Sequence, residues 1–135
     1  MNALLILTCI LGYAVANPSF FTLIPNADSI PNPCNRIRTI RNPTHSDLAG
    51  GADAEINQFG MDMARVNYSW PALCPLDSDG DGLSNGQELG DPFCKWTPGC
   101  QISAMEYILD TALSHPGVCE PLESATCLKV GFLYF

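Results

Sequence analysis

Residues 74–94 read CPLDSDGDGLSNGQELGDPFC, and the acidic part of this stretch sets the character of the fold. Residues 77–88 alternate aspartates with small residues and then turn at a glycine, which is the pattern of a calcium-binding loop. Such a loop supplies oxygen ligands from positions 1, 3, 5, 7, 9 and 12. Those positions are filled by Asp77, Asp79, Asp81, Leu83 through its backbone carbonyl, Asn85 and Glu88. The sequence therefore predicts calcium as the cofactor and residues 77–88 as its site.

The spacing of this loop has a physical reason. Calcium binds about six to eight hard oxygen ligands, and alternate residues of a tightly curled loop direct their carboxylates inward. Gly82 stands at the sixth position, where the chain must turn sharply. Without a cation, the four carboxylates of residues 77–88 would repel one another. A solvated acidic turn and a magnesium site are the alternatives. The match at every ligand position, and the reluctance of Mg²⁺ to lose water, favour calcium.

The flanks of the loop differ from those of an EF-hand, which has a helix on each side. Pro71 and Pro75 precede the loop, and Gly90-Asp91-Pro92 follows it. Because each proline removes a backbone donor, we expect residues 70–75 to be irregular and the loop to lack its helix pair. A site of this kind cannot open a helix pair as calcium sensors do, so a structural ion is expected. The affinity class of extracellular modules is about 10⁻⁴–10⁻³ M.

The composition points to one small extracellular domain. The chain has 135 residues and a formal net charge of −8, which argues against nucleic acid and against an anionic membrane surface as partners. Residues 1–16 are apolar and end in Ala-Val-Ala, so we interpret them as a signal peptide. No later segment is long and apolar enough for membrane insertion. A secreted protein is the expectation.

Cysteine is frequent, with seven residues in the chain. Cys9 lies in the predicted signal peptide. An even number in a small secreted chain predicts three disulfides among the remaining six, which are Cys34, Cys74, Cys94, Cys100, Cys119 and Cys127. Sequence alone leaves 15 pairings open. Cys74 and Cys94 bracket the acidic loop and could tie its ends together. A zinc site is disfavoured because the chain has no C-x-x-C pair.

Periodicity predicts few regular elements. Residues 20–24 form a strand-like run, and residues 36–41 alternate arginine with apolar residues, which predicts a half-buried strand with Ile37 on the face opposite the arginines. Residues 58–66 could be a short helix or a strand. Residues 101–114 have the spacing of an amphipathic helix packed on the domain, with its apolar face made of Ile102, Met105, Ile108, Leu109, Ala112 and Leu113. Asn67-Tyr68-Ser69 is a candidate glycosylation site at Asn67.

The same segments resemble the temptin family. The residues that carry the resemblance are Cys74, the acidic core from Asp77, Asn85-Gly86, Glu88 to Pro92, Cys94 and Trp96, together with upstream segments such as Leu23-Ile24-Pro25-Asn26 and Pro33-Cys34. It covers residues 18–98. It implies that Cys74 pairs with Cys94. The second and third disulfides stay open, with Cys100 and Cys119 as the candidate partners of Cys34. Residues 100–135, with Cys100, Cys119 and Cys127, have no assigned counterpart in the family and are treated as a carboxy-terminal extension.

These observations predict a small, disulfide-rich, irregular α+β domain over residues 17–99, with an EF-hand-like calcium loop lacking its helix pair and a helix in the extension. No nucleophile–base motif is present, so an enzyme is not expected. The resemblance implies a secreted signalling protein that binds extracellular proteins or peptides, as a component of a water-borne pheromone attractant complex. The alternative is an extracellular matrix or adhesion module stabilised by calcium, or a domain detached from a larger secreted enzyme.

Overall fold

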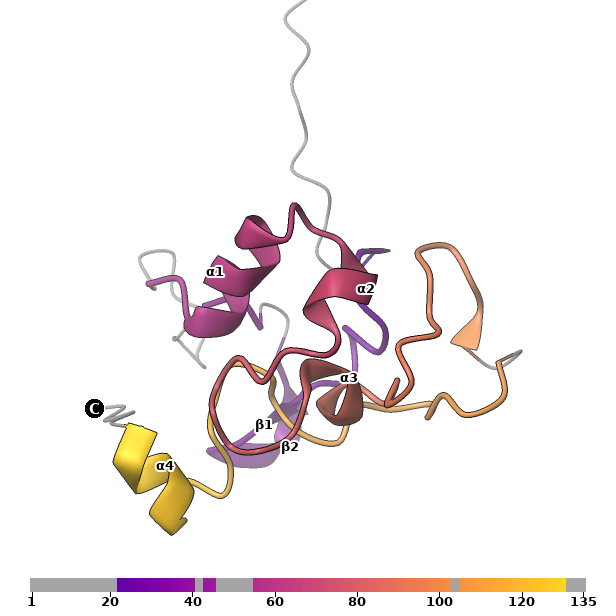
Figure 1. Cartoon of the computed structure of the whole chain (residues 1–135). Coiled ribbons are helices and arrows are strands. Elements are labelled where there is room, and N and C mark those ends of the chain that lie inside the picture. The colour runs from indigo at the N-terminus through magenta and orange to yellow at the C-terminus, as the bar shows by residue number, and fades with distance from the viewer. Residues whose placement is uncertain (1–21, 41–42, 46–54, 103–104, 131–135) are drawn as a thin grey trace, which may run out of the picture.

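The computed structural model describes residues 22–40, 43–45, 55–102 and 105–130. Its elements in chain order are β1 (Pro31–Asn32), β2 (Asn35–Thr39), α1 (Gln58–Arg65), α2 (Trp70–Leu73), α3 (Asn85–Glu88) and α4 (Ala125–Val130). These short elements are joined by long turns and loops (Figure 1), which agrees with a small, irregular α+β domain. The predicted signal peptide and the first two residues of the predicted strand 20–24 lie outside the described residues, and residues 22–24 form a turn.

Among the helices in the described ranges, none has the length and apolarity that crossing a membrane requires.

The arginine-rich segment forms the longer strand of a hairpin. β2 pairs with β1 in antiparallel fashion, and the Asn32 side chain closes the turn by accepting hydrogen bonds from the backbone N–H groups of Cys34 and Asn35. The strand is therefore where it was predicted, but its half-burial was wrong: Ile37 is 97% exposed. The sheet has only two strands, so the Ile37 face has no covering layer, and burial begins at Ile40, just beyond the strand.

The segment whose type was left open is a helix, α1. Asn57 caps it, because its Oδ1 accepts a hydrogen bond from the Gly60 N–H while its Nδ2 donates to the Pro43 carbonyl. Phe59 and Met63, four residues apart, are both buried and so lie on one face of the helix. A capped helix start and one apolar face together explain the helical outcome.

Residues 70–73 correct the expectation of irregular backbone before the loop. They form α2, with Pro71 in the first turn. A proline there removes only a donor that has no intrahelical partner, so it is compatible with the helix start. Trp70 and Leu73 are each 1% exposed and anchor this turn in the core.

The predicted amphipathic helix over residues 101–114 is wrong for the part that the structure describes. Residues 105–114 form bends and turns. Tyr107 has a φ of 76°, which breaks a right-handed helix. The N–H groups of Leu109 and Leu113 donate to the carbonyls of Gly90 and Glu88 instead of to residues of the same segment. Long-range backbone pairing thus replaces helical pairing. The helix of the extension is α4, further along the chain.

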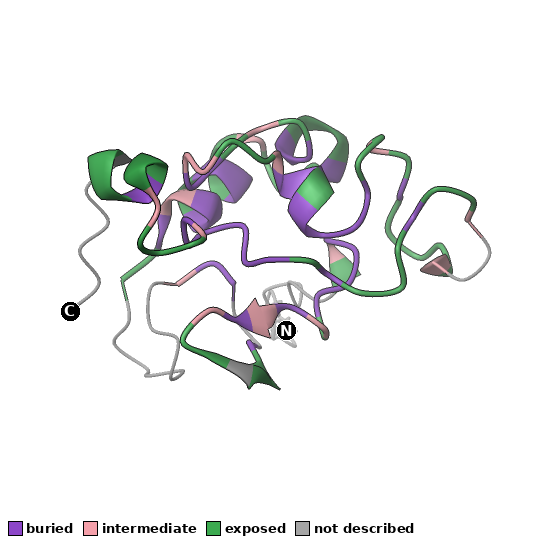
Figure 2. Ribbon diagram, turned by 90° about the horizontal axis from the view of Figure 1, so that it is seen from below, coloured by how far each residue is buried: buried purple, intermediate pink, exposed green. Residues whose placement is uncertain are grey.

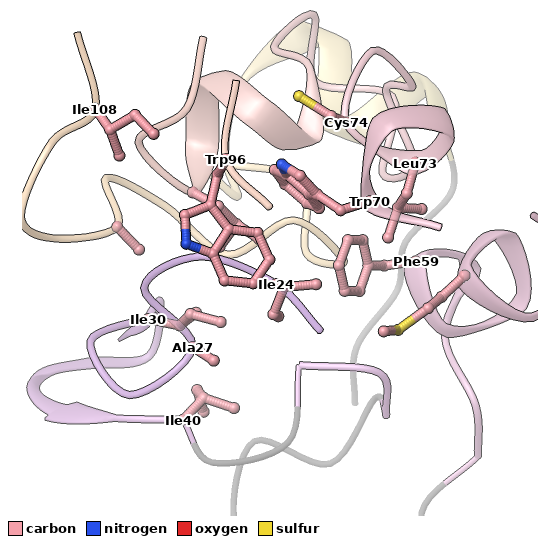
Figure 3. Packing of buried hydrophobic residues seen from close by; sticks show 13 residues of the cluster. Ile24, Ala27, Ile30, Ile40, Phe59, Trp70, Leu73, Cys74, Trp96 and Ile108 are labelled. Carbon is pink, nitrogen blue, oxygen red and sulfur yellow. The ribbon is translucent and has the colours of Figure 1, made fainter. Parts of the chain in front are cut away.

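The core is small and centred on two tryptophans. The Trp70 and Trp96 rings meet edge to face, with centroids 6.4 Å apart, and Ile24 and Phe59 pack beside them (Figure 3). Buried segments line the middle of the molecule, while α4 and the hairpin are largely exposed (Figure 2). The core therefore joins the amino-terminal segment, α1, α2 and the segment that follows the acidic loop.

The disulfides agree in part with expectation. Cys74 bonds to Cys94, as the family resemblance implied. Cys119 bonds to Cys127 at a Cα–Cα distance of 5.4 Å, and Cys34 and Cys100 are exposed free thiols. The pairing of Cys34 with Cys119 was wrong, because Cys119 is joined to a cysteine only eight residues away. The free thiols of Cys34 and Cys100 contradict their pairing with each other and the expected third disulfide.

Candidate metal centre

The loop of residues 77–88 is curled by its own side chains. The two carboxylate oxygens of Asp77 accept hydrogen bonds from the backbone N–H groups of Gly80, at 2.8 Å, and Gly82, at 3.0 Å. Both glycines have a positive φ, 76° and 99°, which other residues adopt at a cost. Asp81 Oδ1 accepts from the Leu83 N–H at 2.7 Å. These bonds give the loop its tight turn.

The end of the loop is fixed by a one-turn helix, α3. Ser84 and Gln87 form a capping box at its start, each side chain accepting a hydrogen bond from the backbone N–H of the other. This start holds Asn85 and Glu88 on the inner side of the turn, where both are fully buried. The acidic loop thus ends in a single helical turn, and α2 before it is equally short.

Four side-chain oxygens of this loop are buried and have no hydrogen-bond partner. They belong to four of the predicted ligands and are Asp79 Oδ2, Asp81 Oδ2, Asn85 Oδ1 and Glu88 Oε2. In each residue the other polar atom is engaged: one oxygen of each aspartate accepts from a backbone N–H, Asn85 Nδ2 donates to Leu73 O and Ser78 Oγ, and Glu88 Oε1 accepts from Ser114. Each side chain is held by one atom and keeps the other free for a ligand.

The carboxylates converge closely. One ligand atom each from Asp77, Asp79 and Asp81 lies within 4.8 Å of the others. The sequence-predicted Leu83 lies on the same loop and is 41% exposed, as expected for a residue that would contribute only its backbone carbonyl. The described structure therefore brings the predicted aspartates together.

Burial and neighbouring carboxylates raise the pKa values of Asp79 and Glu88. Burial, and then the neighbouring Asp81, raise the pKa of Asp79 to about 7. Burial, and then the Asp79 carboxylate, raise the pKa of Glu88 to about 9. Negative charge is disfavoured at both groups unless a cation compensates it. The raised pKa values thus reflect burial and the crowding of carboxylates in the loop.

A segment far along the sequence holds Glu88 in place, and sequence reasoning missed it. Ser114 Oγ donates to Glu88 Oε1 at 2.8 Å within the protein interior, and the Leu113 N–H donates to the Glu88 carbonyl at 2.6 Å. No sequence pattern near Ser114 predicts this role, because the neighbouring residues do not indicate which distant segment Ser114 will contact. This contact links the acidic loop to the carboxy-terminal third of the chain.

Asp91 is a second residue that the sequence analysis did not single out. It is fully buried, and its Oδ2 accepts from the Trp70 indole N–H and the Trp96 backbone N–H, while its Oδ1 accepts from the Lys95 N–H. The carboxylate thus joins α2 to the segment beyond Cys94. Asp91 therefore holds together the segments on either side of the acidic loop, and both of its carboxylate oxygens have hydrogen-bond partners.

The comparisons with known proteins bear on this loop and its frame. The family model described as Temptin C-terminal matches residues 14–118. The chain belongs to the temptin family. It is 39% identical over 121 residues to the protein named Temptin from Aplysia californica, and the match covers 89% of this chain and 91% of that protein. No solved structure matches. The family match spans the acidic loop, the disulfide across it and Ser114, so the temptin resemblance seen in the sequence is confirmed.

The candidate glycosylation residue is exposed, and the two histidines of the chain make local hydrogen bonds. Asn67 of the candidate glycosylation site is exposed just after α1, and its modification stays a prediction. His115 is fully buried, and its Nδ1 accepts a hydrogen bond from the Gly117 N–H. His45 Nδ1 is paired with Thr44 Oγ1. Both histidines of the chain thus have local structural contacts.

Proposed function

We propose that this temptin-family protein is a secreted, calcium-stabilised binding protein that acts with other extracellular proteins or peptides as a component of a water-borne attractant. The observation that carries the calcium part is the set of four buried, unpartnered oxygens in residues 77–88. Buried polar atoms without partners are rare in folded proteins, and an ion is one of their standard explanations. Membership of the temptin family supports the extracellular signalling part.

The ligand set fits calcium in chemistry and number. Asp79, Asp81, Asn85 and Glu88 would each offer their free oxygen, and Asp77 stands in the same cluster. All are hard oxygen ligands, which calcium prefers over the nitrogen and sulfur ligands typical of zinc. Bound calcium would supply the positive charge that lets Asp79 and Glu88 ionise inside the protein.

The position of the loop favours a structural ion over a sensor. The Cys74–Cys94 disulfide spans the loop, and Gly86 packs directly against the Cys74 sulfur. Ser114 ties Glu88 to the carboxy-terminal third of the chain. An ion in the loop would therefore stabilise the contact between distant segments. Short helices on either side leave no helix pair that could open on binding.

Calorimetric titration of calcium into the oxidised protein tests the metal part. We expect one site in the wild-type protein, and binding weakened at least tenfold in Glu88→Gln and Asp81→Ala, because each variant removes a charged ligand. Glu123→Gln is the matched control, since Glu123 is exposed and lies outside the loop. Calcium binding of equal strength in Glu88→Gln and Glu123→Gln would reject the site.

The attractant part needs a behavioural measurement in the source organism. We expect secretions depleted of this protein with an antibody to lose attraction, and the purified protein to restore it. Full attraction by the depleted secretions would count against the signalling role and leave the calcium site untouched.

A further inference from the structure

We propose that four exposed apolar side chains beside α3 form a docking surface for a cationic amphipathic segment of another extracellular protein. The surface, here called the aromatic ridge, consists of Phe93, Tyr107, Leu109 and Leu113. The inference deepens the proposed binding function and rests on it, but it does not require that calcium be the ion in the loop.

Two segments that run past each other in opposite directions build the ridge. The Phe93 and Tyr107 rings meet edge to face with centroids 6.0 Å apart. Further along, the Leu109 N–H donates to the Gly90 carbonyl at 2.8 Å, and the Leu113 N–H donates to the Glu88 carbonyl. The carboxy-terminal segment passes alongside α3 in this region (Figure 1). The four apolar residues therefore follow one continuous, backbone-bonded pair of segments.

The four residues of the ridge are exposed, although residues next to them in the sequence are buried in the core. Phe93 is 63% exposed, Tyr107 69%, Leu109 45% and Leu113 60%. Ile108 and Ala112, in the same segment, are buried. Single exposed apolar residues are ordinary, but a row of them along one structural unit is typical of an interaction site. Aromatic side chains in particular supply contact area at low entropic cost.

The backbone at the aromatic end of the ridge is held in an unusual conformation. Tyr107 has a φ of 76° and Cys94, directly after Phe93, has a φ of 54°. A residue with a side chain adopts this left-handed region at a cost, so the surroundings must hold it there. The Cys74–Cys94 disulfide does so for Cys94. The disulfide thus constrains the backbone next to Phe93, which lowers the entropy that binding at this ring would cost.

The charges around the ridge indicate the chemistry of its partner. Glu106 and Asp110 are exposed and flank Tyr107 and Leu109 in the sequence. Lys95, exposed two residues after Phe93, is the single Lys or Arg between residues 66 and 128. That stretch holds nine acidic residues, of which four belong to the acidic loop and Asp91 is buried, so Glu106 and Asp110 supply the negative charge beside the ridge. An apolar surface with an acidic border complements a segment that combines apolar side chains with lysine or arginine. The same charges disfavour an anionic membrane surface.

The test uses a probe of this chemistry and a probe of the opposite charge. The first is a fluorescent amphipathic helical peptide about 14 residues long made of Leu and Lys, and the second replaces Lys by Glu. Binding is measured by fluorescence anisotropy in saturating calcium. We expect the Leu/Lys peptide to bind and the Leu/Glu peptide not to. Absence of Leu/Lys binding, or equal binding of both peptides, would overturn the proposal.

Matched variants separate the ridge from general surface stickiness. Phe93→Ser with Tyr107→Ser is compared with Ile37→Ser with Leu128→Ser, two exposed apolar residues on other elements. We expect the ridge variant to lose affinity for the Leu/Lys peptide by roughly tenfold and the control to keep it. Equal affinities would overturn the proposal. Leu113→Ser gives the same comparison if the double variant fails to fold.

Two further readouts distinguish the alternatives. Glu106→Gln with Asp110→Asn should weaken peptide binding and flatten its salt dependence, whereas Glu123→Gln should do neither. Sedimentation of the wild-type protein should show a monomer, and a dimer that dissociates on ridge substitution would mean that a second copy occupies the ridge. Calcium titration of every variant reports the metal site separately, so failure of the ridge and failure of the metal site are distinguishable.

Discussion

Replacing Ser114 with alanine removes the hydroxyl that donates to Glu88 Oε1 at 2.8 Å, without touching a residue of the acidic loop. Without a metal ion, Glu88 is protonated at neutral pH, because its pKa is raised to about 9. The lost bond then involves a neutral acceptor and is worth about 1 kcal/mol. With calcium bound, Glu88 is a carboxylate, and a hydrogen bond to a charged group is worth about 1.5–3 kcal/mol.

The difference between these two states sets the effect on calcium affinity. It amounts to about 0.5–2 kcal/mol, which weakens binding by about 2- to 30-fold. Calorimetric titration of calcium at fixed pH measures it. Ser29→Ala is the matched control, because Ser29 Oγ accepts from the Ala112 N–H and anchors the same segment without touching Glu88. An unchanged affinity in Ser114→Ala, or an equal loss in Ser29→Ala, would refute the reasoning.

Three other substitutions test the frame of the loop. Gly86→Ala should destabilise the protein by about 1–3 kcal/mol in urea with or without calcium, because the new Cβ would overlap Cys74 Sγ and lie 2.6 Å from the Asp91 carbonyl. Asp91→Asn keeps one oxygen acceptor and replaces the other by an NH2 group that cannot accept a hydrogen bond. It should lower the free energy of unfolding by about 1–3 kcal/mol in the same assay. Burial lowers the pKa of His115 to about 4 from 6.5. Its neutral form therefore contributes stability above pH 6.5 that is lost as the pH falls towards 4, by about 3 kcal/mol, and His115→Asn should flatten this loss in pH-dependent melts.

The acidic loop was the part of the molecule most open to prediction from sequence. Its predicted ligands stand at alternate positions of one short segment, so their spacing alone predicts that their oxygens converge, and the structure brings Asp77, Asp79 and Asp81 together. The capped start of α3 follows from local residues too. Binding of calcium itself stays a prediction.

The parts that sequence reasoning missed depend on contacts between distant segments. The amphipathic spacing of residues 101–114 suggested a helix, but the backbone of this segment forms hydrogen bonds to Glu88 and Gly90 in place of helical ones. Ser114 and Asp91 act through partners that no local pattern reveals. The disulfide between Cys119 and Cys127 likewise could not be predicted from the spacing of the cysteines.

A thermal melt of the oxidised chain, after removal of the predicted signal peptide, tests the central claim most directly. It is run in millimolar calcium and in chelator, for the wild-type protein and Glu88→Gln. Calcium at tenfold saturation stabilises a folded state that binds it by about 1.4 kcal/mol, which raises the melting temperature by several degrees. The account predicts this rise for the wild-type protein and its loss in Glu88→Gln. Identical melting of the wild-type protein in calcium and in chelator would contradict it.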